Sequence, residues 1–395
     1  MLDLGCSPLA DVLTDQHANG ADDQMVPLNL AWCEACGLLQ IAETVSPEIL
    51  FSSQYPYLSS TSDSWLDHCR KNAIELINQL GLDQNSLVIE PASNDGYMLQ
   101  NFVSRGIPVL GIEPSRVPSL QAEAAGVPTL EAFFNRDLAV QLASEGRLAD
   151  LIIANNVLAH VMDLHDFMAG LVILLKPQGT LVIEVPYVED LIAKNAFDTI
   201  YHQHLCYFGI NSLDTLMRQH NIKIIDVKQL TTHGGSLRIY ARRYGDAQPI
   251  VAEMKTHEQR QGGMNWDYYA QFVTRVDLVR DELVSLLKGI KSDGFRIAAY
   301  GAAAKGTTLM HYCEIGKNYL DYVVDRNEFK QGKRMPGNAL EILSPEFLLT
   351  DKPDYLLLLP WNLAEEILSQ LRNYQIGGGR VIVPLPSLWI TDFQE

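Results

Sequence analysis

The feature that most constrains the fold is an alternation of strand and helix patterns between residues 65 and 243. Short apolar runs of strand length are separated by longer stretches in which apolar residues recur every three or four positions. Such alternation is typical of a doubly wound α/β sheet, in which helices connect parallel strands. The expected elements are helices at 65–80 and 164–175, strands at 86–90, 108–113, 148–154 and 180–185, and a turn at 176–179.

A second series of the same kind occupies the C-terminal part of the chain. After Arg243, a polar segment rich in Gln, Glu and Lys leads into a helix expected at 268–290. The elements expected beyond it are strands at 296–300, 322–324, 355–359 and 380–383 and a helix at 364–371. These patterns predict a small N-terminal domain at 1–55, an α/β domain at 56–245 and a second α/β domain at 246–395.

The charge balance limits the kinds of partner. Lys and Arg number 30 against 48 Asp and Glu, a net charge of −18, which argues against a nucleic-acid or anionic-membrane surface. No apolar run reaches the roughly 18 residues of a membrane span, and Met1 is not followed by a signal-peptide pattern. We therefore expect a cytoplasmic protein. The six cysteines are too sparse for a disulfide framework.

The first candidate site is a turn between strand and helix at residues 87–96. The strand ends at Glu90, small residues follow, and Gly96 precedes a helix expected to open at Tyr97. Ligands of open α/β sheets bind at this carboxyl edge, but only one glycine of the dinucleotide pattern is present. Carboxylates suit the ammonium and sulfonium groups of S-adenosylmethionine better than they suit a pyrophosphate. The alternative is an ordinary βα turn with an acidic helix start.

Two further strand ends add polar residues to the same edge. Glu113 ends the next strand, where a carboxylate can accept both ribose hydroxyls, and Asn155 follows the third strand. Glu90, Gly96 and Glu113 at this spacing favour an S-adenosylmethionine site over an ordinary turn. His160 would then lie over the transferred methyl group, and its alternative role is to cap the following helix.

The segment 198–208 concentrates proton chemistry. His202 and His204 lie close to Tyr201, and imidazole titrates near neutrality, so it is a natural base for a carbon-bound proton. An extended segment would group 201 with 203 and 202 with 204, whereas a helical turn would regroup them. A metal site and simple packing or capping are the alternatives. A third metal ligand would come from His160, His165 or His233.

The C-terminal series has its own loop between strand and helix. Residues 301–306, Gly-Ala-Ala-Ala-Lys-Gly, are small enough for backbone N–H groups to approach a diphosphate, and Lys305 adds a cation. Asp325 closes the next strand, where a dinucleotide fold has its ribose-binding carboxylate. The alternative is that glycine and alanine serve only close packing. The turn at 234–235, with Arg238, either closes the site or is a β-hairpin turn.

Together these motifs resemble the S-adenosylmethionine-dependent nucleotide-sugar C-methyltransferases of deoxysugar biosynthesis. The resemblance covers nearly the whole chain. The matching segments are Tyr-Pro-Tyr-Leu-Ser-Ser-Thr-Ser at 55–62, Ser-Asn-Asp-Gly at 93–96, Asn-Asn-Val-Leu-Ala-His at 155–160, Glu-Val-Pro-Tyr at 184–187, Phe-Asp-Thr-Ile-Tyr-His at 197–202, Thr-His-Gly-Gly-Ser-Leu-Arg at 232–238, Tyr-Gly-Ala-Ala-Ala-Lys-Gly at 300–306 and Leu-Pro-Trp-Asn at 359–362.

The resemblance implies a fold, a reaction and site residues. The fold is a class I methyltransferase (Rossmann-like) domain followed by a second Rossmann-like α/β domain, with a small zinc-ribbon-like domain in front. The reaction removes a proton next to the ketone of a nucleotide-linked keto sugar and methylates the enolate. His204 is the implied base, with Tyr201, His160 and Gln203 completing the catalytic set. The implied cofactor-binding residues are Tyr57, Glu90, Ser93, Asn94, Gly96, Glu113 and Asn155, and the substrate-binding residues are His202, His233, Arg238, Lys305 and Asp325.

Two departures from the family pattern bear on function. Relatives carry Tyr-His-Glu-His where this chain has Gln203, and an amide orients a neighbouring histidine without stabilising its charge. The family's zinc domain has two CxxC pairs, but this chain begins after the first would lie, leaving Cys33 and Cys36 as ligands and Cys6 as an available third. Two thiolates do not close a tetrahedral zinc site. Two rival functions are methylation of a different small molecule at carbon or oxygen, and a catalytically silent ligand-binding relative.

Overall fold

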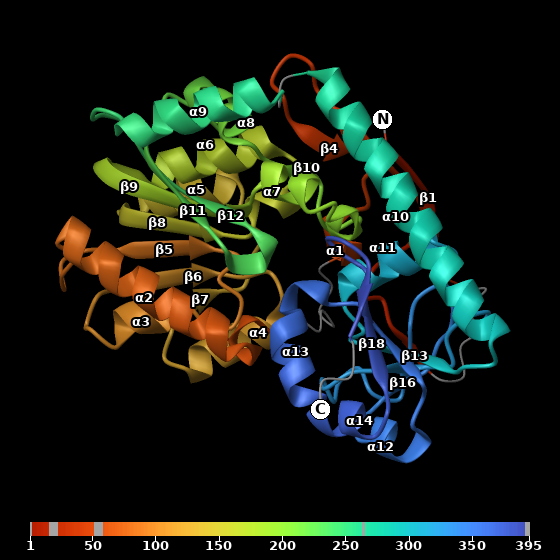
Figure 1. The fold of residues 1–395 in the computed structure, drawn as a ribbon. Helices are drawn as coiled ribbons and strands as arrows, with labels where there is room; N and C mark the ends of the chain where they lie inside the picture. The colour runs from red at the N-terminus through yellow and green to blue at the C-terminus, as the bar shows by residue number, and fades with distance from the viewer. Residues whose placement is uncertain (1, 16–22, 51–57, 263–264, 392–395) are drawn as a thin grey trace.

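The computed structural model describes residues 2–15, 23–50, 58–262 and 265–391 (Figure 1). The N-terminal part forms an antiparallel sheet with the strand order β1-β3-β4-β10. Its last strand comes from far along the chain, because Cys206 pairs with Gln40. The bounds are β1 Leu2–Pro8, β3 Met25–Trp32, β4 Leu39–Ile41 and β10 Cys206–Tyr207.

The central sheet has seven strands in the order β11-β12-β9-β8-β5-β6-β7. Numbered within the sheet, this order is 6-7-5-4-1-2-3, and β12 alone runs antiparallel to its neighbours. This is the class I methyltransferase sheet, and its strand order reverses between β5 and β8. The bounds are β5 Val88–Pro91, β6 Val109–Ile112, β7 Thr129–Leu130, β8 Ala149–Asn155, β9 Leu175–Pro186, β11 Lys223–Leu230 and β12 Ser236–Arg242.

Helices cover both faces of the seven-stranded sheet (Figure 1). Strand β8 shows why both faces need cover, because its apolar side chains alternate between them. Leu151 and Ile153 pack with α2, α3 and α4 on one face. Ile152 and Ala154 belong to the core on the opposite face, with α5, α6 and α8. The bounds are α2 Asp63–Leu80, α3 Gln100–Val103, α4 Arg116–Ala124, α5 Arg136–Ser144, α6 Leu164–Leu174, α7 Val188–Ala193 and α8 Ile210–Gln219.

The C-terminal part forms a six-stranded sheet with the order β16-β14-β13-β17-β18-β19. Within the sheet this order is 3-2-1-4-5-6, that of a dinucleotide-binding Rossmann fold, with only β19 antiparallel. Its strand order reverses between β13 and β17. The bounds are β13 Ile297–Tyr300, β14 Val323–Val324, β16 Ile342–Leu343, β17 Tyr355–Leu358, β18 Arg380–Val383, β19 Trp389–Ile390, α11 Ala304–Tyr312, α12 Phe347–Asp351, α13 Ala364–Gln370 and α14 Arg372–Ile376.

The three sheets belong to one packed body. Helix α9 (Pro249–Gln261) leads to α10 (Trp266–Ser292), which runs past the N-terminal strands to the six-stranded sheet (Figure 1). The ring centroids of Trp32 on β3 and Tyr269 on α10 lie 5.6 Å apart, and buried apolar residues of all three sheets form one continuous core. No described helix is long and apolar enough to cross a membrane. Short elements are α1 Pro47–Leu50, and β2 Thr14–Asp15, which pairs with β15 Lys333–Arg334.

Most of the predicted strands and helices are present, and three predictions are corrected. The polar segment after Arg243 contains helix α9. The turn expected at 176–179 lies within β9, where the pairing register with β8 jumps between Leu175 and Thr180. The helix expected to open at Tyr97 begins at Gln100.

Candidate active site

One cavity of about 950 Å³ joins the two points where the strand orders reverse. Ligands of open α/β sheets bind at such points, where neighbouring crossovers leave on opposite faces. Loops after β5, β6 and β8 form one wall of the cavity, and loops after β13 and β17 form another. The lining residues used below are Asn94, Glu113, Asn155, Asn156, His160, Tyr201, Gln203, His204, Ala303, Ala304, Lys305, Asp325, Lys330 and Trp361.

Between these walls lies the catalytic segment, which we define as residues 197–205. It begins with a 3-10 turn at Phe197–Thr199 and leads into β10. A second turn follows, because the amide of His204 donates to the carbonyl of Tyr201 at 2.8 Å. This turn settles the grouping that the sequence left open: Tyr201 and His204 share one side of the segment, with their ring centroids 4.1 Å apart.

The hydrogen bonds of His204 define its tautomer. Its Nδ1 lies 2.9 Å from the carbonyl oxygen of Thr199, and a carbonyl only accepts, so Nδ1 carries the proton. In the neutral ring Nε2 is therefore the acceptor, and the hydroxyl of Tyr201 donates to it at 3.0 Å. A ring held in this way presents its basic nitrogen to a hydroxyl on the cavity wall.

His160 joins the cluster from the turn after β8. Its ring centroid lies 4.9 Å from that of His204, and its Nδ1 donates to the carbonyl of Gln203 at 2.6 Å. Burial lowers the pKa of His160, and the backbone carbonyls of Gln203 and Asn156 act in the opposite direction. A neutral His160 therefore uses its one N–H on the catalytic segment.

The side chains of His202 and Gln203 point toward the N-terminal part of the chain. His202 is fully buried and donates from Nε2 to the carbonyl of Pro27 at 3.1 Å, and it does not line the cavity, which corrects its expected contact with substrate. The Gln203 amide donates to the carbonyl of Ala10 at 2.6 Å. Its side chain is thus anchored away from His204, rather than beside the base as the family comparison suggested.

The wall after β5, β6 and β8 carries polar groups suited to a cationic, hydroxyl-bearing ligand. Burial raises the pKa of Glu113, although the amides of Asn94 and Ser115 donate to its carboxylate at 3.0 and 2.8 Å. The Oδ1 atoms of Asn155 and Asn156 are buried and have no hydrogen-bond partner among the described residues. Buried acceptors normally have a donor, so these oxygens fit the ammonium and ribose hydroxyls of S-adenosylmethionine.

Three other expected cofactor residues do not line the cavity. Glu90 and Ser93 are fully buried, and burial raises the pKa of Glu90 well above its usual range. Gly96 has φ of +77°, and a Cβ there would lie 3.0 Å from a methyl of Val127. The glycine therefore serves the turn and its packing on the next crossover. Tyr57 lies outside the described residues.

The opposite wall contains the expected loop after β13. Ala303, Ala304 and Lys305 line the cavity at the start of α11, whereas a Cβ at Gly301 would lie 2.5 Å from Pro360. Gly301 therefore serves close packing, and contact between residues 303–305 and a diphosphate stays a prediction. Asp325 also lines the cavity, where its carboxylate accepts from the amide of Ala302 at 2.7 Å.

Lys305 belongs to a small, partly buried network on this wall. Its Nζ donates to Asn362 at 2.7 Å and lies 4.9 Å from the ring centroid of Trp361. Burial lowers the pKa of Lys305, and Asp198 opposes the change. Burial raises the pKa of Asp198 to about 6. Sequence reasoning assigned no role to Asp198, Trp361 or Asn156, although all three lie within segments that it quoted.

Arg238 does not line the cavity either, which corrects its expected contact with substrate. Its side chain is 4% exposed, and its Nη2 donates to the carboxylate of the fully buried Glu184 on the neighbouring strand at 2.9 Å. The same nitrogen lies 2.8 Å from Nε2 of His68. The turn before Arg238 was expected either to close the site or to be a β-hairpin turn. Gly234 and Gly235 lie between the hairpin strands β11 and β12, and both also line the cavity. The side chain of His233 lies outside the described residues.

Cys33 and Cys36 lie in a tight turn in which the amide of Gly37 donates to the carbonyl of Cys33 at 2.8 Å. Within the described part of the chain, no three His, Cys, Asp or Glu residues are grouped closely enough to hold a metal ion. These two thiols alone do not fit a tetrahedral zinc site. The rival metal interpretation of His202 and His204 likewise finds no third ligand there. The His202 ring bonds the Pro27 carbonyl, whereas the His204 ring bonds Tyr201.

Family models match three consecutive parts of the chain. Residues 1–51 match a zinc binding domain, 65–227 a methyltransferase domain, and 231–386 a C-methyltransferase C-terminal domain. The C-methyltransferase NovU of Streptomyces niveus is 35% identical over 389 residues, which span 98% of this chain and 92% of NovU. The chain belongs to this C-methyltransferase family.

The C-methyltransferase is S-adenosylmethionine-dependent, as its matched methyltransferase domain and family membership show. Solved structures match it distantly. The magnesium protoporphyrin IX methyltransferase of Synechocystis PCC 6803 is 15% identical, with a TM-score of 0.35 over 46% of this chain and 82% of its own. The 1,6-didemethyltoxoflavin-N1-methyltransferase of Burkholderia thailandensis is 19% identical, with a TM-score of 0.38 over 55% and 100%.

Proposed function

We propose that this C-methyltransferase deprotonates the carbon next to a ketone of a nucleotide-linked keto sugar and methylates the resulting enolate. The observation that carries the proposal is the single cavity, which joins a donor wall, a Tyr-His pair and a second Rossmann-type crevice. The crevice of the seven-stranded sheet suits a methyl donor, and that of the six-stranded sheet suits a nucleotide. The base lies between the two crevices.

The donor wall is formed by Asn94, Glu113, Asn155 and Asn156. When bound, S-adenosylmethionine supplies an electrophilic methyl group. The side-chain oxygens of Asn155 and Asn156, which have no partner in the described part of the chain, would accept hydrogen bonds from its polar groups. The Glu113 carboxylate keeps lone pairs for ribose hydroxyls beyond its two amide contacts.

The Tyr201–His204 pair removes the proton. The phenol oxygen of Tyr201 takes the carbon-bound proton while its own proton passes to Nε2 of His204, and the carbonyl of Thr199 holds the resulting imidazolium through Nδ1–H. The C–H electron pair becomes the enolate, whose carbon would bond to the methyl group while the methyl–sulfur bond breaks and S-adenosylhomocysteine leaves. A positive His204 next to the developing enolate stabilises it in a buried site.

The opposite wall holds the nucleotide end. The start of α11 has no side-chain cap and lies on the cavity with Lys305, and a helix N-terminus with a cation is a suitable site for a diphosphate. Lys330 adds a second cation on this wall in an otherwise acidic protein. A bound diphosphate would also compensate the charge of Lys305, whose side chain is half-buried.

The test is methyl transfer from labelled S-adenosylmethionine to a panel of nucleotide-linked 4-keto sugars, with matched sugars that lack the ketone as controls. We expect a carbon-methylated product from at least one keto sugar and none from the controls. Calorimetric binding of S-adenosylmethionine without binding or turnover of any nucleotide-linked sugar would instead point to another small molecule.

A further inference from the structure

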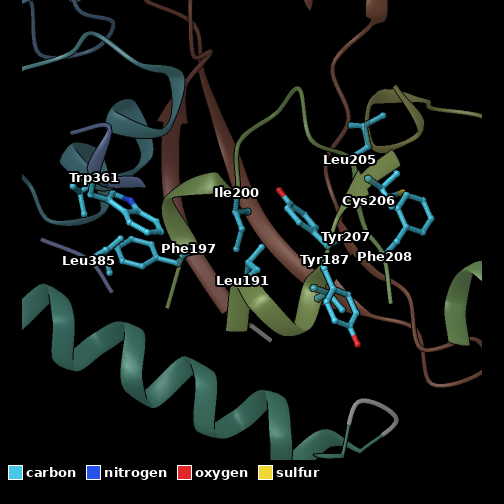
Figure 2. Close-up of a cluster of buried hydrophobic side chains, with 14 of the residues drawn as sticks. Tyr187, Leu191, Phe197, Ile200, Leu205, Cys206, Tyr207, Phe208, Trp361 and Leu385 are labelled. Carbon is cyan, nitrogen blue, oxygen red and sulfur yellow. The ribbon is translucent and has the colours of Figure 1, made fainter. Parts of the chain in front are cut away.

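The C-terminal unit holds the catalytic segment at two points. Nε1 of Trp361, after β17, donates to Oδ2 of Asp198 at 2.6 Å. Oγ1 of Thr308, on α11, donates to the carbonyl of Ile200 at 2.7 Å. Asp198 and Ile200 are fully buried and Thr308 is 1% exposed, so water does not compete for these bonds. Figure 2 shows Trp361 beside Phe197 of the segment, with Ile200 further along it.

The residue between these two anchor points is Thr199, whose carbonyl determines the tautomer of His204. That carbonyl accepts from Nδ1 of His204 at 2.9 Å. The peptide plane that carries it is bounded by Thr199 and Ile200, so fixing Asp198 on one side and the Ile200 carbonyl on the other limits its rotation. A rotated carbonyl would no longer bond Nδ1, and the proton could then move to Nε2 and block the basic nitrogen.

We propose that Thr308 and Trp361 are positioning residues for His204. The C-terminal unit then fixes the tautomer of the base as well as forming a wall of the cavity. They act through the Thr199 carbonyl, which keeps the proton on Nδ1 and the lone pair on Nε2. The proposal rests on the proposed role of His204. It goes beyond that role because it makes the second Rossmann-like unit part of the machinery for proton removal.

Two substitutions at Thr308 separate positioning from packing. Thr308→Val keeps the shape but removes the hydroxyl, whereas Thr308→Ser keeps the hydroxyl and removes a methyl group. If Thr308 acts by positioning, Thr308→Val is the impaired variant and Thr308→Ser is close to the parent. If it acts only by packing, the order reverses. Thr307→Val is the matched control, because Thr307 is equally buried on the same helix and has no hydrogen bond to the catalytic segment among the described residues.

The first measurement needs no substrate. Imidazole nitrogen NMR shifts of ¹⁵N-histidine-labelled protein report the tautomer, and the His204 signals are assigned by their loss in His204→Asn. We expect the Nδ1–H form in the parent, in Thr308→Ser and in Thr307→Val, and a mixture of tautomers in Thr308→Val. An unchanged Nδ1–H form in Thr308→Val would overturn the proposal, even if no substrate had yet been found.

The second measurement is turnover with a nucleotide-linked keto sugar that passes the test above. We expect Thr308→Val to lower kcat by about tenfold while the affinity for S-adenosylmethionine stays unchanged. Trp361→Phe should also lower kcat, and Trp389→Phe, a change on the exposed edge strand β19, should not. Equal kcat in Thr308→Val and the parent would overturn the proposal. Absence of turnover in the parent would count against the proposed substrate and leave the NMR result to decide.

Discussion

At the scale of single residues, the central unit is the Tyr201–His204 pair. Its hydrogen bond lies on the cavity wall, and its far side is tied to a backbone carbonyl. Such an arrangement is typical of a base whose tautomer and direction are fixed before substrate arrives. Substituting each residue in turn separates the role of the imidazole from that of the phenol hydroxyl.

We expect His204→Asn to lower kcat by about 10²- to 10⁴-fold, the usual contribution of a general base. Tyr201→Phe should also lower kcat, because the hydroxyl that relays the proton is lost while the ring stays in place. Calorimetry should give the parent affinity for S-adenosylmethionine in both, since neither residue belongs to the donor wall. Parent-like turnover in His204→Asn would remove it as the base.

A second residue-scale prediction concerns His202 and pH. Burial lowers its pKa, while the carbonyls of Pro27 and Val26 and the charge of Glu43 act in the opposite direction. Because the native pKa lies below the unfolded value of about 6.5, folding favours the neutral ring. The stability from His202 is full above about pH 6.5 and is lost as pH falls through the lowered native pKa.

His202→Gln keeps a donor for the Pro27 carbonyl and removes the titration. We expect the free energy of unfolding to fall less between about pH 7.5 and about pH 5.5 in the variant than in the parent, by about 1 kcal/mol. Urea unfolding at both pH values measures the difference. His160 has a lowered pKa in both proteins, so its contribution cancels. Equal losses would show that His202 does not titrate on unfolding.

The sequence predicted which residues of the segment carry chemistry better than it predicted where they point. Tyr201, His204 and His160 meet at the cavity as expected. The side chains of His202 and Gln203 do not meet the base, because a turn regroups them and the N-terminal part of the chain offers carbonyl acceptors for both. Those acceptors belong to Pro27 and Ala10, far away in the sequence, so no local pattern could reveal them.

At the scale of elements, the hairpin turn between β11 and β12 joins the sheet to the cavity. Gly235 has φ of +129°, and a Cβ there would collide with the carboxylate of Asp190. The carbonyl of Gly235 accepts from the amide of Tyr187 at 3.0 Å, and Lys194 donates to the carbonyl of Gly234. The turn is thus fixed where it lines the active site.

We expect Gly235→Ala to lower the free energy of unfolding by about 1–3 kcal/mol through backbone strain and to lower kcat/KM through displacement of the turn. Gly245→Ala is the matched control. It has φ of +115°, but no atom of the described residues would lie closer than 4.0 Å to an added Cβ, and it does not line the cavity. Gly245→Ala should lower the free energy of unfolding and leave kcat/KM unchanged. A parent-like kcat/KM in Gly235→Ala would separate this turn from catalysis.

Elements with strong periodicity were predictable, and those fixed by partners were not. Helices α2 and α10 and strands β5, β8 and β17 follow from apolar spacing. Helix α9 was missed because only Val251 and Glu258 of its residues are buried, so it has almost no apolar stripe. Two-residue strands such as β2 and β15 exist only through pairing with each other.

At the scale of the whole molecule, two sheets with different strand orders direct their ligand edges at one cavity. This arrangement predicts that the two binding functions can be separated. Asn155→Ala should weaken S-adenosylmethionine binding by about tenfold, the value of one hydrogen bond of about 1–1.5 kcal/mol. Lys305→Ala should weaken the binding of a nucleoside diphosphate by about 10- to 100-fold, because it removes a charged contact.

Each variant should leave the other ligand's affinity unchanged within about twofold, since additivity holds for distant sites. Isothermal titration with S-adenosylmethionine and, separately, with a nucleoside diphosphate checks all four combinations. If Lys305→Ala bound the diphosphate as the parent does, the nucleotide would have to be held elsewhere in the cavity.

The pairing of Gln40 with Cys206 has a consequence for synthesis on the ribosome. Strand β4 leaves the exit tunnel with one edge unpaired, and its partner is made only after most of the central sheet. At about 5–20 residues per second this interval is on the order of ten seconds. An open strand edge is a site of mispairing with other chains. A nascent chain stalled before residue 206 should therefore recruit chaperones more strongly than one stalled shortly after β10 has emerged.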